Sequence, residues 1–102
     1  MRKIEKQMLE AVNSNEDWSL ANTTVVYDGE DNASKVYLHE HLIAIVDDFG
    51  IARACVSTLI AWPTRTTMSR LRALGVDVCK RKGDVYLNGE VIAEWNFYYW
   101  RH

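Results

Sequence analysis

A nine-residue pattern occurs twice in this chain and limits the folds that are available to it. Residues 36–44 (VYLHEHLIA) return 49 positions later as residues 85–93 (VYLNGEVIA). In the second copy Asn88-Gly89 stands between β-branched and aromatic residues. This predicts a hairpin with a two-residue type I′ turn, because both turn residues need positive φ. The first copy predicts the same hairpin, with His39-Glu40 as a less favourable turn pair.

The rest of the chain predicts two helices and further strands. Apolar residues at helical spacing predict helices over residues 2–13 and 65–74, the second capped by Thr64 and ended by Gly75. Trp18 and Leu20 are expected in a loop, and Pro63 is expected to exclude a helix immediately before it. The predicted strands cover residues 23–27, 35–38, 42–46, 51–59, 76–80 and the Asn-Gly hairpin.

Each half of the chain therefore reads as a helix, a strand and a hairpin. We interpret the halves, about residues 1–50 and 64–102, as copies of a duplicated αβββ unit, with the 51–59 strand inserted between them. The predicted fold is of the α+β class: an antiparallel, mostly meander sheet with two helices on one face. No glycine-rich phosphate loop or βαβ alternation is present.

Length and composition predict one globular domain over residues 1–102. Apolar residues make up 48% and charged residues 25% of the chain, which is ordinary for a folded domain. The N-terminus does not read as a signal peptide, and no apolar run approaches a membrane span. We therefore expect a cytoplasmic location without membrane contact, and reduced thiols at Cys55 and Cys79.

Charge is unevenly distributed along the chain. The net charge of the whole sequence is −2, whereas residues 64–82 carry +5. On a helical wheel Met68, Leu71 and Leu74 face inward, and the polar residues between them form an outer surface. This surface and the basic turn that follows are a candidate phosphate or nucleic-acid site: Thr64, Arg65, Ser69, Arg70, Arg72, Lys80, Arg81 and Lys82. A solvated helix followed by a basic turn explains the same residues.

The C-terminal aromatic run is the second candidate site. A strand with one solvated face alternates apolar with polar residues, and residues 95–100 (WNFYYW) do not. Both faces are therefore expected to be covered, either by the rest of the chain or by a partner. Aromatic residues are enriched at interface hot spots, and they also stack on nucleic-acid bases. The candidate partner-binding residues are Trp95, Phe97, Tyr98, Tyr99 and Trp100.

Catalytic and metal-binding motifs are weak. His39 and His41, with Glu40 or His102, have residue types that bind metals, but His39 falls in the predicted turn and His41 beyond it, so they need not converge. No serine or cysteine lies in a recognisable nucleophile motif. We expect no enzyme activity, no metal and no cofactor.

Three segments together resemble a group of small tailed-bacteriophage proteins. They are residues 22–27, the V-x-L-H hairpin from Val36 with Ile43-Ala44, and the helix of residues 62–74, which carries a T-T-x-S-R-L motif. Glu40 and Arg72 stand where the group has glycine and asparagine. The resemblance implies a phage accessory protein made in the cytoplasm of an infected bacterial host, and it carries over no active site.

We therefore expect a non-enzymatic phage protein that binds a macromolecule. The first hypothesis is a protein-binding, anti-CRISPR-like inhibitor of host machinery or defence, whose partner is a host or phage protein. The alternative is a small nucleic-acid-binding domain that uses the basic 64–82 segment. The sequence leaves homodimer formation open.

Overall fold

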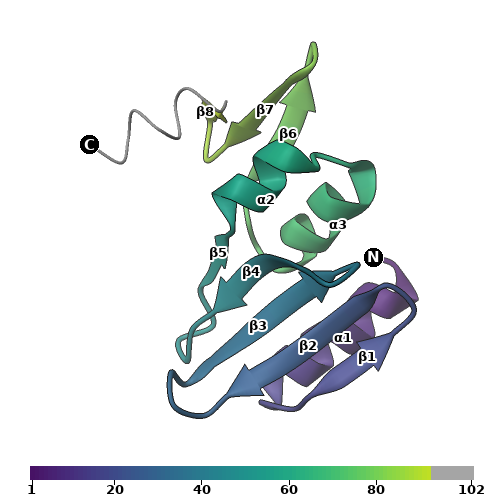
Figure 1. Cartoon of the computed structure of the whole chain (residues 1–102), viewed down its shortest axis with the longest axis vertical. Coiled ribbons are helices and arrows are strands. Elements are labelled where there is room, and N and C mark those ends of the chain that lie inside the picture. Colours follow the sequence, from purple (N-terminus) through teal and green to yellow (C-terminus); the bar gives the residue numbers. More distant parts are fainter. Residues whose placement is uncertain (93–102) are drawn as a thin grey trace.

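A computed structural model of the chain describes residues 1–92 (Figure 1). Three helices and eight strands follow one another in these residues. In chain order they are α1 (Lys3–Asn13), β1 (Trp18–Leu20), β2 (Thr23–Asp28), β3 (Ala33–Leu38), β4 (His41–Val46), β5 (Ala52–Ala54), α2 (Val56–Ala61), α3 (Arg65–Ala73), β6 (Val78–Arg81), β7 (Asp84–Leu87) and β8 (Glu90–Ile92).

The α+β class and the antiparallel meander are confirmed, and the strands divide into two sheets. The first sheet has the order β1-β2-β3-β4-β5 and the second the order β6-β7-β8, and every pair is antiparallel. Because neighbours in each sheet are also neighbours in the sequence, no crossover connection is needed within either sheet. Helices α2 and α3 lie between the two sheets (Figure 1).

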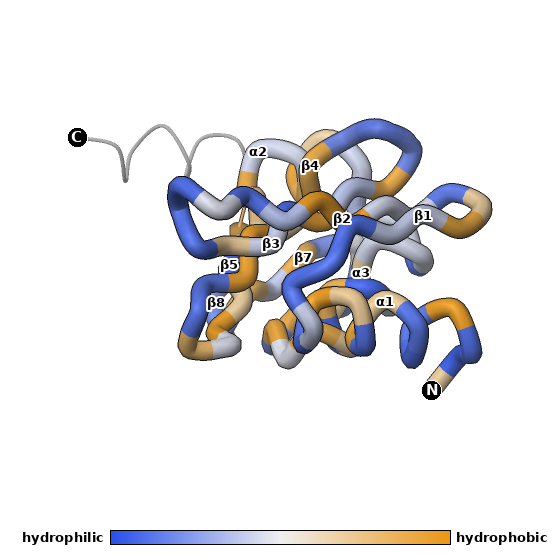
Figure 2. The backbone as a smooth tube through the Cα atoms, turned by 90° about the horizontal axis from the view of Figure 1, so that it is seen from below, coloured by the Kyte–Doolittle hydropathy of each residue, from blue (hydrophilic) through white to orange (hydrophobic). Residues whose placement is uncertain are grey.

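One face of the five-stranded sheet forms the floor of the core. Val25, Val36 and Ala44 are paired across β2, β3 and β4, and all three are buried. Met8 of α1 and Leu71 of α3 belong to the same buried cluster. Helices α1 and α3 lie on this side of the sheet, and hydrophobic and hydrophilic residues alternate along α1 (Figure 2). This is the amphipathic pattern from which both helices are predicted.

Both predicted hairpins and their turns are confirmed. Asn88 and Gly89 have φ values of 54° and 83°, and His39 and Glu40 have φ values of 51° and 68°. All four residues are in the left-handed region that a type I′ turn requires. His39-Glu40 adopts this backbone without a glycine, which is unfavourable for side chains with a Cβ atom.

The predicted strand over residues 51–59 is wrong in its second half. Only Ala52–Ala54 pair with β4, and α2 begins at Val56. The helix ends at Ala61, and Trp62 has an extended φ of −136°. A residue before proline is pushed out of the helical region, so Pro63 ends the helix two residues ahead of itself instead of excluding it.

Residues 18–20 also differ from the prediction. They form β1 and pair with Thr23–Val25 instead of lying in a loop. Ala21 takes a φ of 53°, which allows the chain to reverse between the two strands. An alanine at such a position is not a recognisable turn signal in the sequence.

The order of elements in the two halves agrees with the predicted repeat. Helix α1 precedes the meander β2-β3-β4, and helix α3 precedes the meander β6-β7-β8. Strand β1, strand β5 and helix α2 are additional to this common pattern. A duplication of an αβββ unit remains a prediction from the sequence.

Candidate nucleic-acid interface

A basic groove with a volume of about 550 Å³ lies between the start of the chain, helix α3 and the β6–β7 hairpin. Five of its residues are lysine or arginine, and none of the eight described residues that line it is acidic. Like charges that line one hollow reinforce each other and attract anions. The residues are Arg2, Arg65, Met68, Ser69, Arg72, Lys80, Lys82 and Gly83.

Helix periodicity places the α3 residues of the groove on one face. Arg65, Ser69 and Arg72 are separated by four and three positions, which brings them above one another on a helix. Thr64 sets the start of this helix, because its Oγ1 accepts a hydrogen bond of 3.1 Å from the backbone N–H of Thr67. Thr64 is thus confirmed as the N-cap.

The β6–β7 hairpin supplies the other side of the groove. Lys82 and Gly83 form its turn, with φ values of 51° and 86°. Lys80 and Lys82 are two positions apart and line the groove together, whereas Arg81 places its guanidinium 5.9 Å from the centroid of the Tyr86 ring. Of the predicted residues, Arg65, Ser69, Arg72, Lys80 and Lys82 line the groove, whereas Thr64, Arg70 and Arg81 do not.

Arg72 is held in place by the backbone of the following strand. Its Nε donates a 2.8 Å hydrogen bond to the carbonyl oxygen of Val78, and the residue as a whole is exposed. This bond uses one of the five N–H donors of the guanidinium. The remaining donors are available to an anion in the groove.

The predicted surface position of Arg70 is wrong. Arg70 is only 3% exposed, and its Nη1 lies 2.8 Å from Glu5 Oε2. Its Nε donates a 3.0 Å hydrogen bond to Thr23 Oγ1. The helical wheel placed Arg70 beside the outer surface because it could not show that α1 and β2 cover this side of α3.

Glu5 is consequently no longer a free negative charge near the groove. Burial raises the pKa of the Glu5 carboxyl, but hydrogen bonds from Ser69, Arg70 and the backbone of Arg2, together with the positive charge of Arg70, leave the pKa below its ordinary value. Ser69 Oγ donates to Glu5 Oε2 at 2.6 Å. The charges of Arg70 and Glu5 therefore neutralise each other inside the protein. Ser69 contacts this pair and also lines the groove.

Arg2 lines the groove and was missed by the sequence interpretation. It is the N-cap residue of α1, and its backbone carbonyl accepts hydrogen bonds from the N–H groups of Glu5 and Lys6. The only signal was a pair of basic residues before an amphipathic helix. Arg2 lies beside α3 only because α1 packs against α3.

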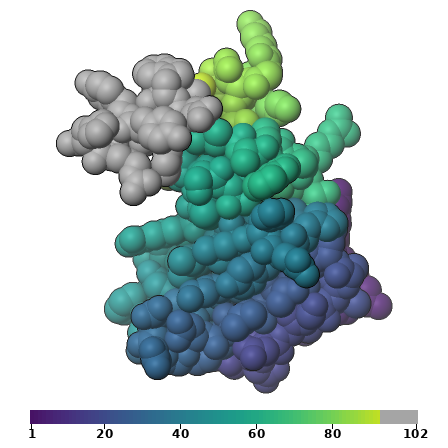
Figure 3. Space-filling view, viewed as in Figure 1, coloured from purple at the N-terminus to yellow at the C-terminus, as the bar shows by residue number. Residues whose placement is uncertain are grey.

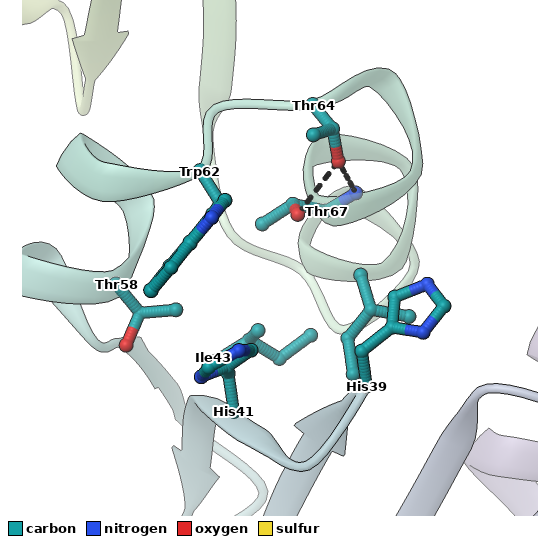
Figure 4. Close-up of a pocket in the computed structure, with 8 residues that line it drawn as sticks. His39, His41, Ile43, Thr58, Trp62, Thr64 and Thr67 are labelled. Carbon is teal, nitrogen blue, oxygen red and sulfur yellow. Dashed lines mark hydrogen bonds between the residues drawn. The ribbon is translucent and has the colours of Figure 1, made fainter.

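A second hollow, of about 260 Å³, lies between the β3–β4 hairpin, the end of α2 and the start of α3 (Figure 4). His41 and Trp62 stack in it, with ring centroids 4.3 Å apart and an angle of 24° between the planes. Three threonines also line it: Thr58 of α2, the N-cap residue Thr64 and Thr67 of α3. We call this hollow the aromatic pocket; it is lined by Leu38, His39, His41, Ile43, Thr58, Trp62, Thr64 and Thr67.

The histidines that were considered as metal ligands do not form a metal site in the described residues. His39 lies in the β3–β4 turn, and His41 stacks on Trp62 (Figure 4). Within residues 1–92 no group of three or more His, Cys, Asp or Glu side chains is close enough to hold a metal ion. His102 and the aromatic residues Trp95, Phe97, Tyr98, Tyr99 and Trp100 lie outside the described residues. Both cysteines are half-buried free thiols.

The fold and its two hollows define a small α+β protein with a basic groove beside an aromatic pocket. In the part of the chain that the structure describes, no helix is long and apolar enough to cross a membrane. The chain belongs to the Kyanoviridae Gp96 protein family, whose profile matches residues 1–101. This membership confirms the predicted phage origin. No curated protein and no solved structure matches the chain.

Proposed function

We propose that this phage protein is a non-enzymatic accessory factor that binds the phosphate backbone of a nucleic acid in its basic groove, in the cytoplasm of the infected host. The observation that carries the proposal is the convergence of five basic side chains, from three separate segments, on one hollow without an acidic residue. Half or more of protein–nucleic acid hydrogen bonds go to phosphates and sugars, and arginine and lysine are their main donors.

The overall negative charge of the chain does not oppose this proposal. The sequence carries −2 in total, but electrostatic attraction to a polyanion depends on the local field, which falls off within about 10 Å at ordinary salt. Glu5, the acidic residue that contacts the groove residue Ser69, is neutralised by Arg70. Arg65 and Arg72 add planar guanidinium groups that can bind two phosphate oxygens at once.

The test compares the affinity of variants for a labelled oligonucleotide, measured by fluorescence anisotropy. The double variant Arg65→Ala/Lys82→Ala removes one cation from α3 and one from the hairpin turn, and both residues are exposed. We expect its affinity to fall about tenfold or more, because each phosphate contact contributes to binding independently of base sequence.

Arg53→Ala is the control for the loss of a positive charge outside the groove. Arg53 is an exposed arginine on the outer face of β5, away from the groove. Its removal changes the net charge by one unit without touching the groove, so the affinity should stay within about twofold of the wild type. Equal losses in both proteins, or no binding by the wild type, would overturn the proposal.

A second candidate function is protein binding, including an anti-CRISPR-like inhibition of host machinery or defence. It is favoured by the outer face of the five-stranded sheet, whose rows of side chains are visible in Figure 3. Val26 and Ile45 lie on this face and are 38% and 39% exposed, and Phe49 in the β4–β5 loop is 84% exposed. Lys35 lies between Val26 and Ile45 in the cross-strand register, so this face mixes exposed apolar side chains with a charged one, which is an ordinary composition for a protein interface.

The protein-binding candidate is tested by affinity purification from bacterial lysate with and without nuclease. A stoichiometric protein partner that survives nuclease and is lost in Val26→Lys/Ile45→Lys supports it. Loss of all bound protein after nuclease treatment contradicts it and agrees with the nucleic-acid proposal.

A further inference from the structure

The aromatic pocket and the basic groove lie on the two sides of the start of α3. Thr64 lines the pocket and Arg65 lines the groove, and these two residues are adjacent in the chain. Consecutive Cα atoms are about 3.8 Å apart, so at this point the linings of the two hollows meet at neighbouring residues of the chain. A polymer that carries both charge and flat rings could therefore occupy both hollows.

The wall of the pocket presents aromatic surface. His41 comes from β4 and Trp62 from the segment between α2 and α3, and their rings stack at 4.3 Å. Trp62 is nevertheless 50% exposed, which leaves much of a large aromatic side chain open to solvent. The side chains of Leu38 and Ile43 add apolar surface. Stacking of a base on an aromatic side chain is a sequence-tolerant way to bind nucleic acids.

The pocket also offers hydrogen-bonding groups to the edge of a ring. The hydroxyls of Thr64 and Thr67 are 2.9 Å apart and share one hydrogen bond (Figure 4). Since one hydroxyl hydrogen is enough for this bond, the other hydrogen is available to a ligand. Thr58 donates its hydroxyl hydrogen to Cys55 Sγ, at 3.3 Å, and keeps its acceptor lone pairs.

The size of the pocket favours one flat ring system. Its volume of about 260 Å³ is slightly below the range of about 300–1,000 Å³ that is typical for drug-sized ligands. A paired base stays stacked inside a duplex and cannot enter such a pocket, whereas an unpaired base can turn outward and stack on protein side chains.

From these observations we infer that the aromatic pocket takes an unpaired nucleobase, so that the polyanion held by the groove is single-stranded. This inference rests on the proposed function, and it adds the class of nucleic acid to it. The stacked pair of His41 and Trp62 binds the base, the threonine hydroxyls contact its edge, and Arg65 holds an adjoining phosphate.

The test compares the affinity of the full chain for three ligands of equal length and charge per strand. They are a labelled single-stranded thymidine oligonucleotide of about ten nucleotides, the same strand made of abasic sites, and the corresponding duplex. We expect the intact single strand to bind about tenfold more tightly than the abasic strand, because only the intact strand supplies bases for stacking. We also expect it to bind more tightly than the duplex.

Variants locate this preference in the pocket. Trp62→Ala should bind the intact and the abasic strand equally well, and Trp62→Phe should restore most of the difference because it keeps an aromatic face. Tyr27→Leu removes an aromatic side chain that lines neither the pocket nor the groove, and it should retain the full preference.

The possible failures are distinguishable. If the wild type binds intact, abasic and duplex ligands equally and with the expected dependence on Arg65 and Lys82, the proposed function stands and the base pocket is refuted. If it binds none of them, the proposed function itself fails. A preference for intact single strands that survives Trp62→Ala places base binding elsewhere and also overturns the inference.

Discussion

Arg70 and Glu5, which are 65 positions apart in the sequence, form a buried ion pair with an N–O distance of 2.8 Å. Arg70 also donates to Thr23, so the pair joins α3, α1 and β2. Ser69, the residue before Arg70, donates to the same carboxylate and lines the basic groove. The core of the fold and the wall of the groove are thus connected through one buried carboxyl group.

Removal of one partner should strongly destabilise the protein. Arg70→Met leaves Glu5 buried without its cation, and we expect the free energy of unfolding to fall by about 3–5 kcal/mol. The double variant Glu5→Leu/Arg70→Met replaces both charges with apolar side chains and should recover most of this loss. Urea denaturation measures both values, and a loss below about 1 kcal/mol in Arg70→Met would contradict a desolvated pair.

The same pair predicts how stability depends on pH. The pKa of Glu5 is lower in the folded protein than its ordinary value of 4.5, so the ionised carboxylate favours the native state. This contribution is complete above the ordinary pKa and is lost as the pH falls through the folded-state pKa. Urea denaturation at several pH values between about 7 and 3 should therefore show a steeper decline for the wild type than for Glu5→Gln. Parallel declines in the two proteins would contradict this assignment.

A glycine in the β3–β4 turn should make the protein more stable. Glu40 adopts a φ of 68°, whereas the corresponding turn residue of the second hairpin is Gly89. Glu40→Gly should raise the free energy of unfolding by about 1 kcal/mol, because glycine has no Cβ atom to clash in the left-handed region. Gly89→Ala should lower it by a similar amount. Thermal denaturation compares the two, and a destabilised Glu40→Gly protein would be the contrary result.

The contribution of the Thr64 cap to stability should be measurable with a single substitution. Thr64→Ala removes the acceptor for the backbone N–H of Thr67, and we expect a loss of about 1 kcal/mol. Thr66→Ala changes a neighbouring threonine that does not cap the helix, and it should be close to neutral. If the two variants are equally stable in chemical denaturation, the cap does not stabilise α3.

Local signals predicted much of this fold. The Asn88-Gly89 turn, the Thr64 cap and the spacing of Met68 and Leu71 each depend on residues within a few positions of one another. Such patterns identify an element before its packing is known. The error at residues 51–59 arose because short apolar runs fit a strand and a helix equally well.

The site was predicted less completely, because its geometry depends on contacts between distant segments. Arg65, Arg72 and Lys82 line the groove as expected, since helix periodicity and a tight turn determine where they lie. The burial of Arg70 and the arrival of Arg2 depend on the packing of α1 against α3. The stack of His41 on Trp62 joins two residues with no shared sequence motif.

The dependence of oligonucleotide affinity on salt tests the central claim most directly. Binding of a single strand in the basic groove releases counterions, so the logarithm of the binding constant should fall linearly with the logarithm of the salt concentration. The single variants Arg65→Ala, Arg72→Ala and Lys82→Ala should each reduce the magnitude of this slope by about 0.7. Arg53→Ala should leave the slope unchanged. A slope that is the same in all four variants and the wild type would contradict a phosphate site in this groove.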